Sequence, residues 1–245
     1  MSGAGADGAG VAVEPLGEDA LLLRLGERID PALNRRVHAL IAAIERERPP
    51  WLRELVPAYA SLALRIADTV DARDPLAHAE RWLRDLLARG VPDEFESRTT
   101  PTIEIPVCYG GEHGRDLDDV ARHCGLTGAD VIDRHALGDY TVAMLGFAPG
   151  FPYLLGLDPA LATPRLTTPR TRVAAGSVGI GGAQTGVYPR EGPGGWRLLG
   201  RTPLPLFDAA REPPSLLAPG DRVRFVPINA GEFARLAARR GRAAP

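Results

Sequence analysis

The sequence contains no lysine, so all 29 basic side chains among its 245 residues are arginines. This absence excludes a Walker-type phosphate-binding lysine, a Schiff-base lysine and a lysine general base. If the protein uses a nucleotide, this chain cannot hold it in a standard P-loop. The 31 acidic residues bring the net charge to -2, and this charge gives no basis for nucleic-acid binding, which normally requires a strongly basic face.

Cysteine is scarce, and long apolar runs are missing. The two cysteines, Cys108 and Cys124, lack Cys-x-x-Cys spacing and a nearby histidine pair, so we expect reduced core residues and no metal site. No segment reaches the ~18 uninterrupted apolar residues of a membrane span. The first ten residues also lack the basic cluster and apolar core of a signal peptide. We therefore expect a soluble, cytoplasmic protein that does not bind membranes.

The N-terminal part carries the pattern of a small α/β sandwich over residues 11–90, after a flexible Gly/Ala-rich tail at 1–10. We expect strands at 11–15, 20–25, 53–58 and 60–66, and helices at 31–47 and 75–89. Each helix begins with an aspartate followed by proline, Asp30-Pro31 and Asp74-Pro75, which is typical of an N-cap with proline at the first helical position. Apolar residues recur on one face of each helix, so we expect both helices to pack on an antiparallel sheet.

The C-terminal part predicts a second, β-rich domain over residues 102–245. The polar, proline-flanked stretch 91–101 is typical of a linker and should be protease-sensitive. After it we expect a strand at 102–109, helices at 116–126 and 127–137, a last strand at 222–227 and a final helix at 231–240. From Tyr140 onward, short apolar runs are repeatedly broken by glycine and proline, which favours a barrel or sandwich over a βαβ fold. The fold class is therefore α+β.

Two familiar motifs are present in unsuitable surroundings. Gly3, Gly5 and Gly8 match G-x-G-x-x-G, but they lie in the tail with no strand before them. The segment 175–179 resembles a nucleophile elbow around Ser177, yet glycines and β-branched residues follow it where the elbow requires a helix. We therefore do not predict a dinucleotide site or a serine hydrolase.

The segment from Gly146 to Pro203 carries the strongest functional signal. It holds 12 of the 28 glycines and six arginines, against two acidic residues, Asp158 and Glu191. Its local charge is thus +4, and the rest of the chain carries -6. Glycines allow close backbone approach, aromatic residues supply flat walls, and arginine suits a carboxylate or a phosphate. The alternative is a tightly turned barrel with glycines at its corners and solvated arginines; composition does not separate the two.

Five blocks in this part of the chain are specific: GFAPGFPYL at 146–154, TPRTRVAAGSVGI at 168–180, QTGVYP at 184–189, PGGW at 193–196 and GRTP at 200–203. In this order they resemble the family of 5-oxoprolinase B subunits, which also covers allophanate hydrolase subunit 1, carboxyltransferase-like domains and sporulation kinase inhibitors. The resemblance extends over residues 11–240. Two departures are Ala174, where the family usually has proline, and Gly192, where it often has serine.

The resemblance implies a cyclophilin-like β-barrel in the C-terminal half and a protein that works with two partner subunits, of types A and C. Together these subunits hydrolyse the substrate 5-oxoproline to glutamate and consume ATP. Because this chain has no P-loop, we expect ATP to be used by the assembled complex and the isolated chain to be inactive. Two alternatives stay open: a regulator that inhibits a sensor histidine kinase, and an allophanate- or urea-related carboxyltransferase-like subunit.

The resemblance and the residue types together suggest a set of site residues. His135 matches a family histidine and suits proton transfer, although a structural tie between a helix end and the barrel fits equally. Gln184 and Thr185 could hold an amide-bearing substrate or belong to a turn network. Arg170 and Arg201 are the candidates for an anion, ahead of Arg190, which we interpret as paired with Glu191. The predicted catalytic residues are His135, Gln184 and Thr185, and the predicted substrate-binding residues are Phe147, Gly150, Phe151, Tyr153, Arg170, Ser177, Tyr188, Trp196 and Arg201.

Overall fold

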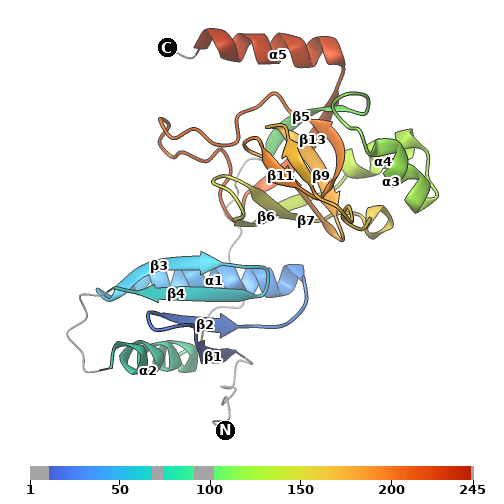
Figure 1. The fold of residues 1–245 in the computed structure, drawn as a ribbon. Coiled ribbons are helices and arrows are strands. Elements are labelled where there is room, and N and C mark those ends of the chain that lie inside the picture. Colours follow the sequence, from blue (N-terminus) through green and yellow to red (C-terminus); the bar gives the residue numbers. More distant parts are fainter. Residues whose placement is uncertain (1–10, 68–73, 91–101, 244–245) are drawn as a thin grey trace. The chain divides into compact units, whose positions relative to one another are not determined.

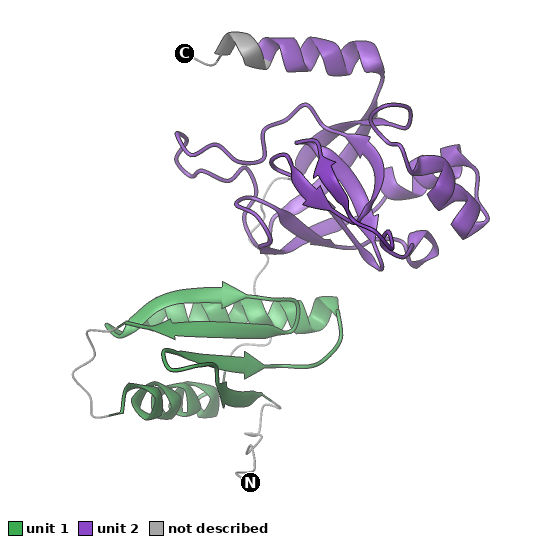
Figure 2. Cartoon of the chain, viewed as in Figure 1, with its two compact units in different colours: residues 1–98 green, residues 99–245 purple. Residues whose placement is uncertain are grey.

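The computed structural model describes residues 11–67, 74–90 and 102–243. The chain divides into two compact units, residues 1–98 and 99–245 (Figure 2). The expected tail at 1–10 and the expected linker at 91–101 lie outside the described residues. The domain limits 11–90 and 102–245 therefore stay predictions.

The N-terminal unit is a four-stranded antiparallel sheet packed against two helices (Figure 1). The strands lie in the order β1-β2-β4-β3. One buried cluster joins alternate residues of β2 and β4 to the apolar stripes of both helices, so the helices cover the same face of the sheet. The elements are β1 (Ala12–Pro15), β2 (Ala20–Arg24), α1 (Pro31–Glu47), β3 (Leu52–Pro57), β4 (Ser61–Ile66) and α2 (Pro75–Ala88).

The two helix starts follow the sequence prediction. The Asp30 side chain accepts hydrogen bonds from the backbone N–H groups of Ala32 and Leu33. The Asp74 side chain accepts one from Ala77, and each helix has proline in its first turn. These bonds satisfy N–H groups that have no partner inside the helix. Every predicted strand and helix of this unit is confirmed, with ends shifted by at most one residue.

The C-terminal unit contains a closed seven-stranded barrel in the order β10-β7-β6-β13-β5-β12-β9 (Figure 1). Neighbouring strands are antiparallel, except that β13 pairs parallel with β5. Closure leaves these strands without a free edge, and a cluster of mainly aliphatic side chains fills the interior. The barrel strands are β5 (Ile103–Tyr109), β6 (Tyr140–Leu145), β7 (Pro152–Leu155), β9 (Ser177–Gly181), β10 (Gln184–Val187), β12 (Arg197–Arg201) and β13 (Arg222–Ile228). The structure confirms the α+β class and the predicted barrel.

Four helical segments and a short β-ribbon surround the barrel. Thr127 and Asp130 form a reciprocal capping box at the start of α4, and Gly125 ends α3 in the left-handed conformation. The ribbon pairs β8 with β11 outside the barrel, and we call it the β8–β11 ribbon. The segments are α3 (Leu117–Cys124), α4 (Gly128–Ala136), the 3₁₀ helix η1 (Pro159–Leu161), α5 (Ala230–Ala243), β8 (Arg170–Val173) and β11 (Gly192–Gly194). In the described part of the chain, no helix has both the length and the apolar character needed to span a membrane.

Candidate functional site

Two cavities lie beside the β8–β11 ribbon, and the first has aromatic walls. Its volume is about 270 Å³, and we call it the aromatic cavity. The five aromatic side chains predicted from separate blocks of the sequence all meet in it. It is lined by Phe147, Phe151, Tyr153, Arg165, Leu166, Pro169, Tyr188, Pro193, Gly194, Gly195 and Trp196. Mostly apolar walls with a few polar groups are typical of small-molecule sites.

Glycines in this region make room for the aromatic rings. A Cβ atom at Gly181 would lie 2.4 Å from Nε1 of Trp196, and one at Gly194 would lie 2.4 Å from the hydroxyl oxygen of Tyr188. Phe151, Tyr188 and Trp196 are at most 5% exposed and meet edge to face at centroid distances between 5.3 and 6.4 Å. These glycines therefore shape the cavity walls by leaving space for the aromatic rings, in addition to the close backbone approach expected from the sequence.

The loop between β6 and β7 forms the rim of the aromatic cavity. Phe147 adopts φ +64°, a conformation that costs a non-glycine residue energy, and its side chain is 65% exposed. Its ring packs against Phe151 and Tyr188. Gly150 is not among the lining residues. It takes φ +76° and fits against Phe207, so its role in this structure is to shape the loop.

Arg165 is the cationic residue among those that line the aromatic cavity. Its guanidinium lies 5.7 Å from the centroid of the Trp196 ring and donates a hydrogen bond to Oε1 of Gln184, with an N–O distance of 3.1 Å. Burial raises the pKa of the Tyr153 and Tyr188 hydroxyls, so both remain protonated donors at neutral pH. The cavity thus combines aromatic walls, hydroxyl donors and one positive charge.

The second cavity has a volume of about 500 Å³ and is lined largely by charged residues, and we call it the arginine cavity. Four arginines and two glutamates contribute to its lining. Both predicted anion-binding arginines and the predicted Ser177 are among them. The residues are Glu112, His113, Arg115, Arg170, Arg172, Val173, Ala174, Ser177, Glu191, Leu198 and Arg201.

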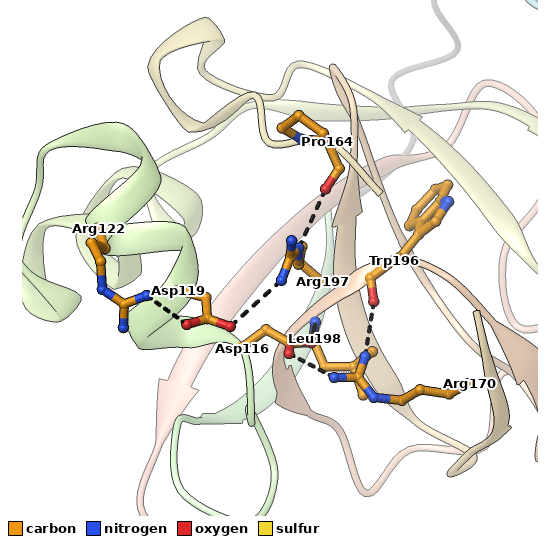
Figure 3. Close-up of polar contacts among 8 residues, drawn as sticks. All are labelled: Asp116, Asp119, Arg122, Pro164, Arg170, Trp196, Arg197 and Leu198. Atoms are coloured by element: carbon orange, nitrogen blue, oxygen red, sulfur yellow. Dashed lines mark hydrogen bonds and ion pairs between the residues drawn. The ribbon is translucent and has the colours of Figure 1, made fainter. Parts of the chain in front are cut away.

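Arg170 is held by a polar network that joins α3, β8 and β12 (Figure 3). Its Nη2 lies 2.6 Å from Oδ1 of Asp116, a residue only 3% exposed, and its Nη1 donates to the carbonyl of Trp196. The other carboxylate oxygen of Asp116 accepts the backbone N–H of Leu198 at 2.7 Å. Arg170 therefore fixes the backbone next to the aromatic cavity, and much of its hydrogen-bonding capacity is already used.

A second carboxylate, Asp119 of α3, extends this network. It pairs with Arg122 on its own helix at 2.9 Å and with Arg197 of β12 at 3.5 Å (Figure 3). Arg197 also donates to the carbonyl of Pro164. These more exposed contacts tie the segment before β8 to the barrel strand that carries the cavity walls.

Arg201 has a different environment from Arg170. Its Nε donates to the carbonyl of Ala175 at 2.8 Å, and its guanidinium lies 5.8 Å from the ring centroid of Phe233 on α5. Among the described residues, neither Arg201 nor Arg115 forms an ion pair with a carboxylate. Glu191, which we had paired with Arg190, instead contacts Nε of Arg172 at 2.8 Å. That prediction was wrong because Glu191 directly precedes β11, and β11 pairs with β8, the strand that carries Arg172.

His135 and Thr185 lie together in the buried core, and neither is among the lining residues of the two cavities. Nδ1 of His135 is 2.8 Å from the Tyr109 hydroxyl, and Nε2 is 3.0 Å from Oγ1 of Thr185, which donates to the carbonyl of Gly179. The ring also stacks on Phe225. Burial lowers the pKa of His135 to about 3, so the imidazole is neutral at physiological pH. This geometry favours the structural alternative, in which His135 ties the end of α4 to the barrel.

The predicted catalytic and substrate-binding residues do not form one site in the structure. The aromatic residues form one cavity, Arg170, Ser177 and Arg201 line another, and His135 with Thr185 lies in the core. Arg165 and Arg115 were not among the predicted site residues, although Arg165 lies in the glycine- and arginine-rich segment. No local signal distinguishes these two arginines from the others, because both lie outside helices and strands and reach the cavities only through the tertiary fold.

Comparisons with known proteins agree with the fold. The family model of the carboxyltransferase domain, subdomain C and D, matches residues 11–217. The chain is 44% identical to the B subunit of 5-oxoprolinase from Bacillus subtilis over 229 residues, covering 90% of this chain and 94% of that protein. It is 48% identical to a conserved protein of Pyrococcus horikoshii whose crystal structure is known, with 90% and 99% coverage and a TM-score of 0.54.

A third similar structure belongs to a longer chain. The crystal structure of TTHA0988 matches with 43% identity and a TM-score of 0.73, and the match covers 86% of this chain but only 40% of that one. The remaining part of TTHA0988 has no counterpart in this match. From the agreement of sequence blocks, family model and near full-length relatives, we conclude that this chain belongs to the family of 5-oxoprolinase B subunits and carries the carboxyltransferase domain, subdomain C and D.

Proposed function

We propose that this chain is the B-type subunit of an ATP-dependent 5-oxoprolinase and that its aromatic cavity binds 5-oxoproline. The observation that carries the proposal is the meeting of five aromatic side chains and Arg165 around about 270 Å³. 5-Oxoproline is a small ring with three methylene or methine carbons, one amide and one carboxylate. Aromatic walls suit the carbons, and a single guanidinium suits the carboxylate.

Each polar group of this substrate has a candidate partner at the cavity. Arg165 would pair with the carboxylate. The protonated hydroxyls of Tyr153 and Tyr188 would donate to the lactam oxygen, where negative charge develops as the ring opens. Gln184, already bonded to Arg165, would position that guanidinium. We assign His135 and Thr185 a positioning role, because they hold β10, which carries Gln184, and both are fully buried.

The ATP-dependent step requires more than this chain. A lactam is stable, and one route to opening it is phosphorylation of its oxygen by ATP with release of ADP. Water then adds to the ring carbon, the ring C–N bond breaks to leave an acyl phosphate with a free amine, and a second water hydrolyses the acyl phosphate to glutamate and phosphate. The chain has no lysine and no P-loop that could hold the phosphates of ATP for this phosphoryl transfer. We therefore propose that the A- and C-type partner subunits supply the remaining groups.

Ligand binding can be tested with the isolated chain. Trp196 is the one tryptophan of the C-terminal unit, so a Trp51→Phe/Trp82→Phe background makes its emission specific for the aromatic cavity. We expect 5-oxoproline to change this emission in a saturable way. Arg165→Gln should weaken binding by roughly tenfold or more, because a charge-assisted contact is lost. Arg224→Gln on β13, paired with Glu104, is the matched control and should bind normally.

Activity needs a second measurement with partner subunits. We expect ATP-dependent glutamate release from the chain combined with A- and C-type subunits, and none from the chain alone. Absence of 5-oxoproline binding, or equal binding by the Arg165 and Arg224 variants, would contradict the assignment of the cavity. Robust turnover by the isolated chain would contradict the proposal that the A- and C-type subunits supply groups needed for the ATP-dependent step.

A further inference from the structure

The arginine cavity is separate from the proposed 5-oxoproline site, although both use the β8–β11 ribbon. Residues close together in the ribbon region line different cavities. Pro169 and Pro193 line the aromatic cavity, whereas Arg170 and Glu191 line the arginine cavity. The ribbon is therefore a wall that the two cavities share. A ligand in one cavity would be separated from a ligand in the other by this ribbon.

The charges of the arginine cavity are only partly compensated. Arg170 is neutralised by Asp116, and Arg172 is paired with Glu191. Arg115 and Arg201 have no carboxylate partner among the described residues. The remaining acid, Glu112, has an 87% exposed side chain and approaches Nε2 of His113 only to 3.9 Å. Two guanidinium groups are thus available to a ligand of the opposite charge.

Arg201 is also held in place in a way that a solvated arginine is not. Its Nε is fixed by the carbonyl of Ala175, and Phe233 of α5 packs beside its guanidinium. The same Phe233 ring lies 4.3 Å from the imidazole of His113, another lining residue. No hydrogen bond is formed by the two Nη groups of Arg201 within the described residues. A positioned, unpaired guanidinium loses little conformational entropy when it binds an anion.

We propose that the arginine cavity binds a phosphate group. Two unpaired arginines match the charge of a phosphate dianion, whereas a lone carboxylate needs only one, and the guanidinium fork fits phosphate oxygens in pairs. Ser177, 3% exposed and at the start of β9, adds a hydroxyl to the lining. The volume of about 500 Å³ exceeds the needs of phosphate alone and leaves space for a larger molecule that carries it.

The source of the phosphate rests on the proposed function, but its binding does not. In an ATP-dependent 5-oxoprolinase the group would belong to ATP, to the phosphorylated lactam or to released phosphate. The shared ribbon would then place the phosphate site next to the ring site. If the chain fails to bind 5-oxoproline yet binds phosphate, the assignment of the aromatic cavity to 5-oxoproline fails and this inference stands.

The test uses the full chain with inorganic phosphate, ADP and ATP as separate probes, each followed by calorimetric titration at constant ionic strength. We expect saturable binding of at least one probe. Arg115→Ala and Arg201→Ala should each weaken it by about ten- to a hundredfold, as expected for loss of a charge-assisted contact. Arg122→Ala is the control, because it removes an exposed arginine of α3 that does not line the cavity. The probe that binds most tightly of the three identifies the source of the phosphate.

Folding is checked by the melting temperature of each variant. Arg115 is exposed and makes no ion pair in the described structure, so Arg115→Ala should melt like the wild type and remains informative if Arg201→Ala does not fold. The inference is overturned if none of the probes binds more tightly than chloride. It is also overturned if Arg122→Ala loses as much affinity as Arg115→Ala, which would indicate a diffuse charge effect.

Discussion

Asp116 offers the sharpest test of how the site is built. Its carboxylate is 3% exposed and accepts from Arg170 and from the backbone of Leu198, so replacement by alanine removes both contacts (Figure 3). Leaving a buried N–H unpaired costs about 1–3 kcal/mol. Breaking a fully buried ion pair costs about 3–5 kcal/mol, but the Arg170 side chain is 26% exposed and keeps the Trp196 carbonyl, so a smaller value applies.

Adding the cost of the unpaired N–H to this reduced ion-pair cost, we expect Asp116→Ala to lower the free energy of unfolding of the C-terminal unit by about 3–5 kcal/mol in total, a large part of a typical domain's 5–15 kcal/mol. Asp119→Ala removes more exposed ion pairs of the same helix and should cost less than about 1 kcal/mol. Urea unfolding followed by Trp196 emission, in the Trp51→Phe/Trp82→Phe background, reports this unit alone. Equal costs for Asp116→Ala and Asp119→Ala, or a cost below about 1 kcal/mol for the former, would refute the reasoning.

Two further predictions concern the cavity wall and the buried histidine. Gly181→Ala should shift the indole of Trp196, change its emission and weaken 5-oxoproline binding, whereas Gly192→Ala, where an added Cβ meets nothing within 4 Å, should do neither; an unchanged emission spectrum for Gly181→Ala would contradict this. The pKa of His135 is lowered to about 3 from 6.5, so between these values the unfolded chain binds the extra proton and stability falls as pH falls. This contribution is at most about 1.4 kcal/mol per pH unit. Unfolding free energies between pH 7 and pH 4 should decline less steeply for His135→Gln than for the wild type, and parallel slopes would count against a neutral, buried His135.

The sequence determined the local structure of this protein. The caps at Asp30 and Asp74, the capping pair Thr127 and Asp130 and the periodicity of apolar residues act within a few residues, so the chain itself specifies where helices begin. The glycine-broken pattern after Tyr140 predicted a barrel, because short strands with frequent turns are compatible with few other folds. The aromatic residues were also identified in advance, since they lie in blocks that resemble one family.

Only the tertiary structure decided which charges are available and which polar groups are buried. Arg170 and Arg201 look alike in the sequence, yet Arg170 meets Asp116 from 54 positions away, whereas Arg201 meets no carboxylate among the described residues. In the sequence, His135 suited proton transfer and a structural tie equally, and the structure places this residue of α4 beside Thr185, 50 positions away. Such pairings depend on barrel closure and strand register, which bring distant residues together. Local sequence patterns do not predict these contacts, because the free energy that stabilises them comes from packing of the whole barrel.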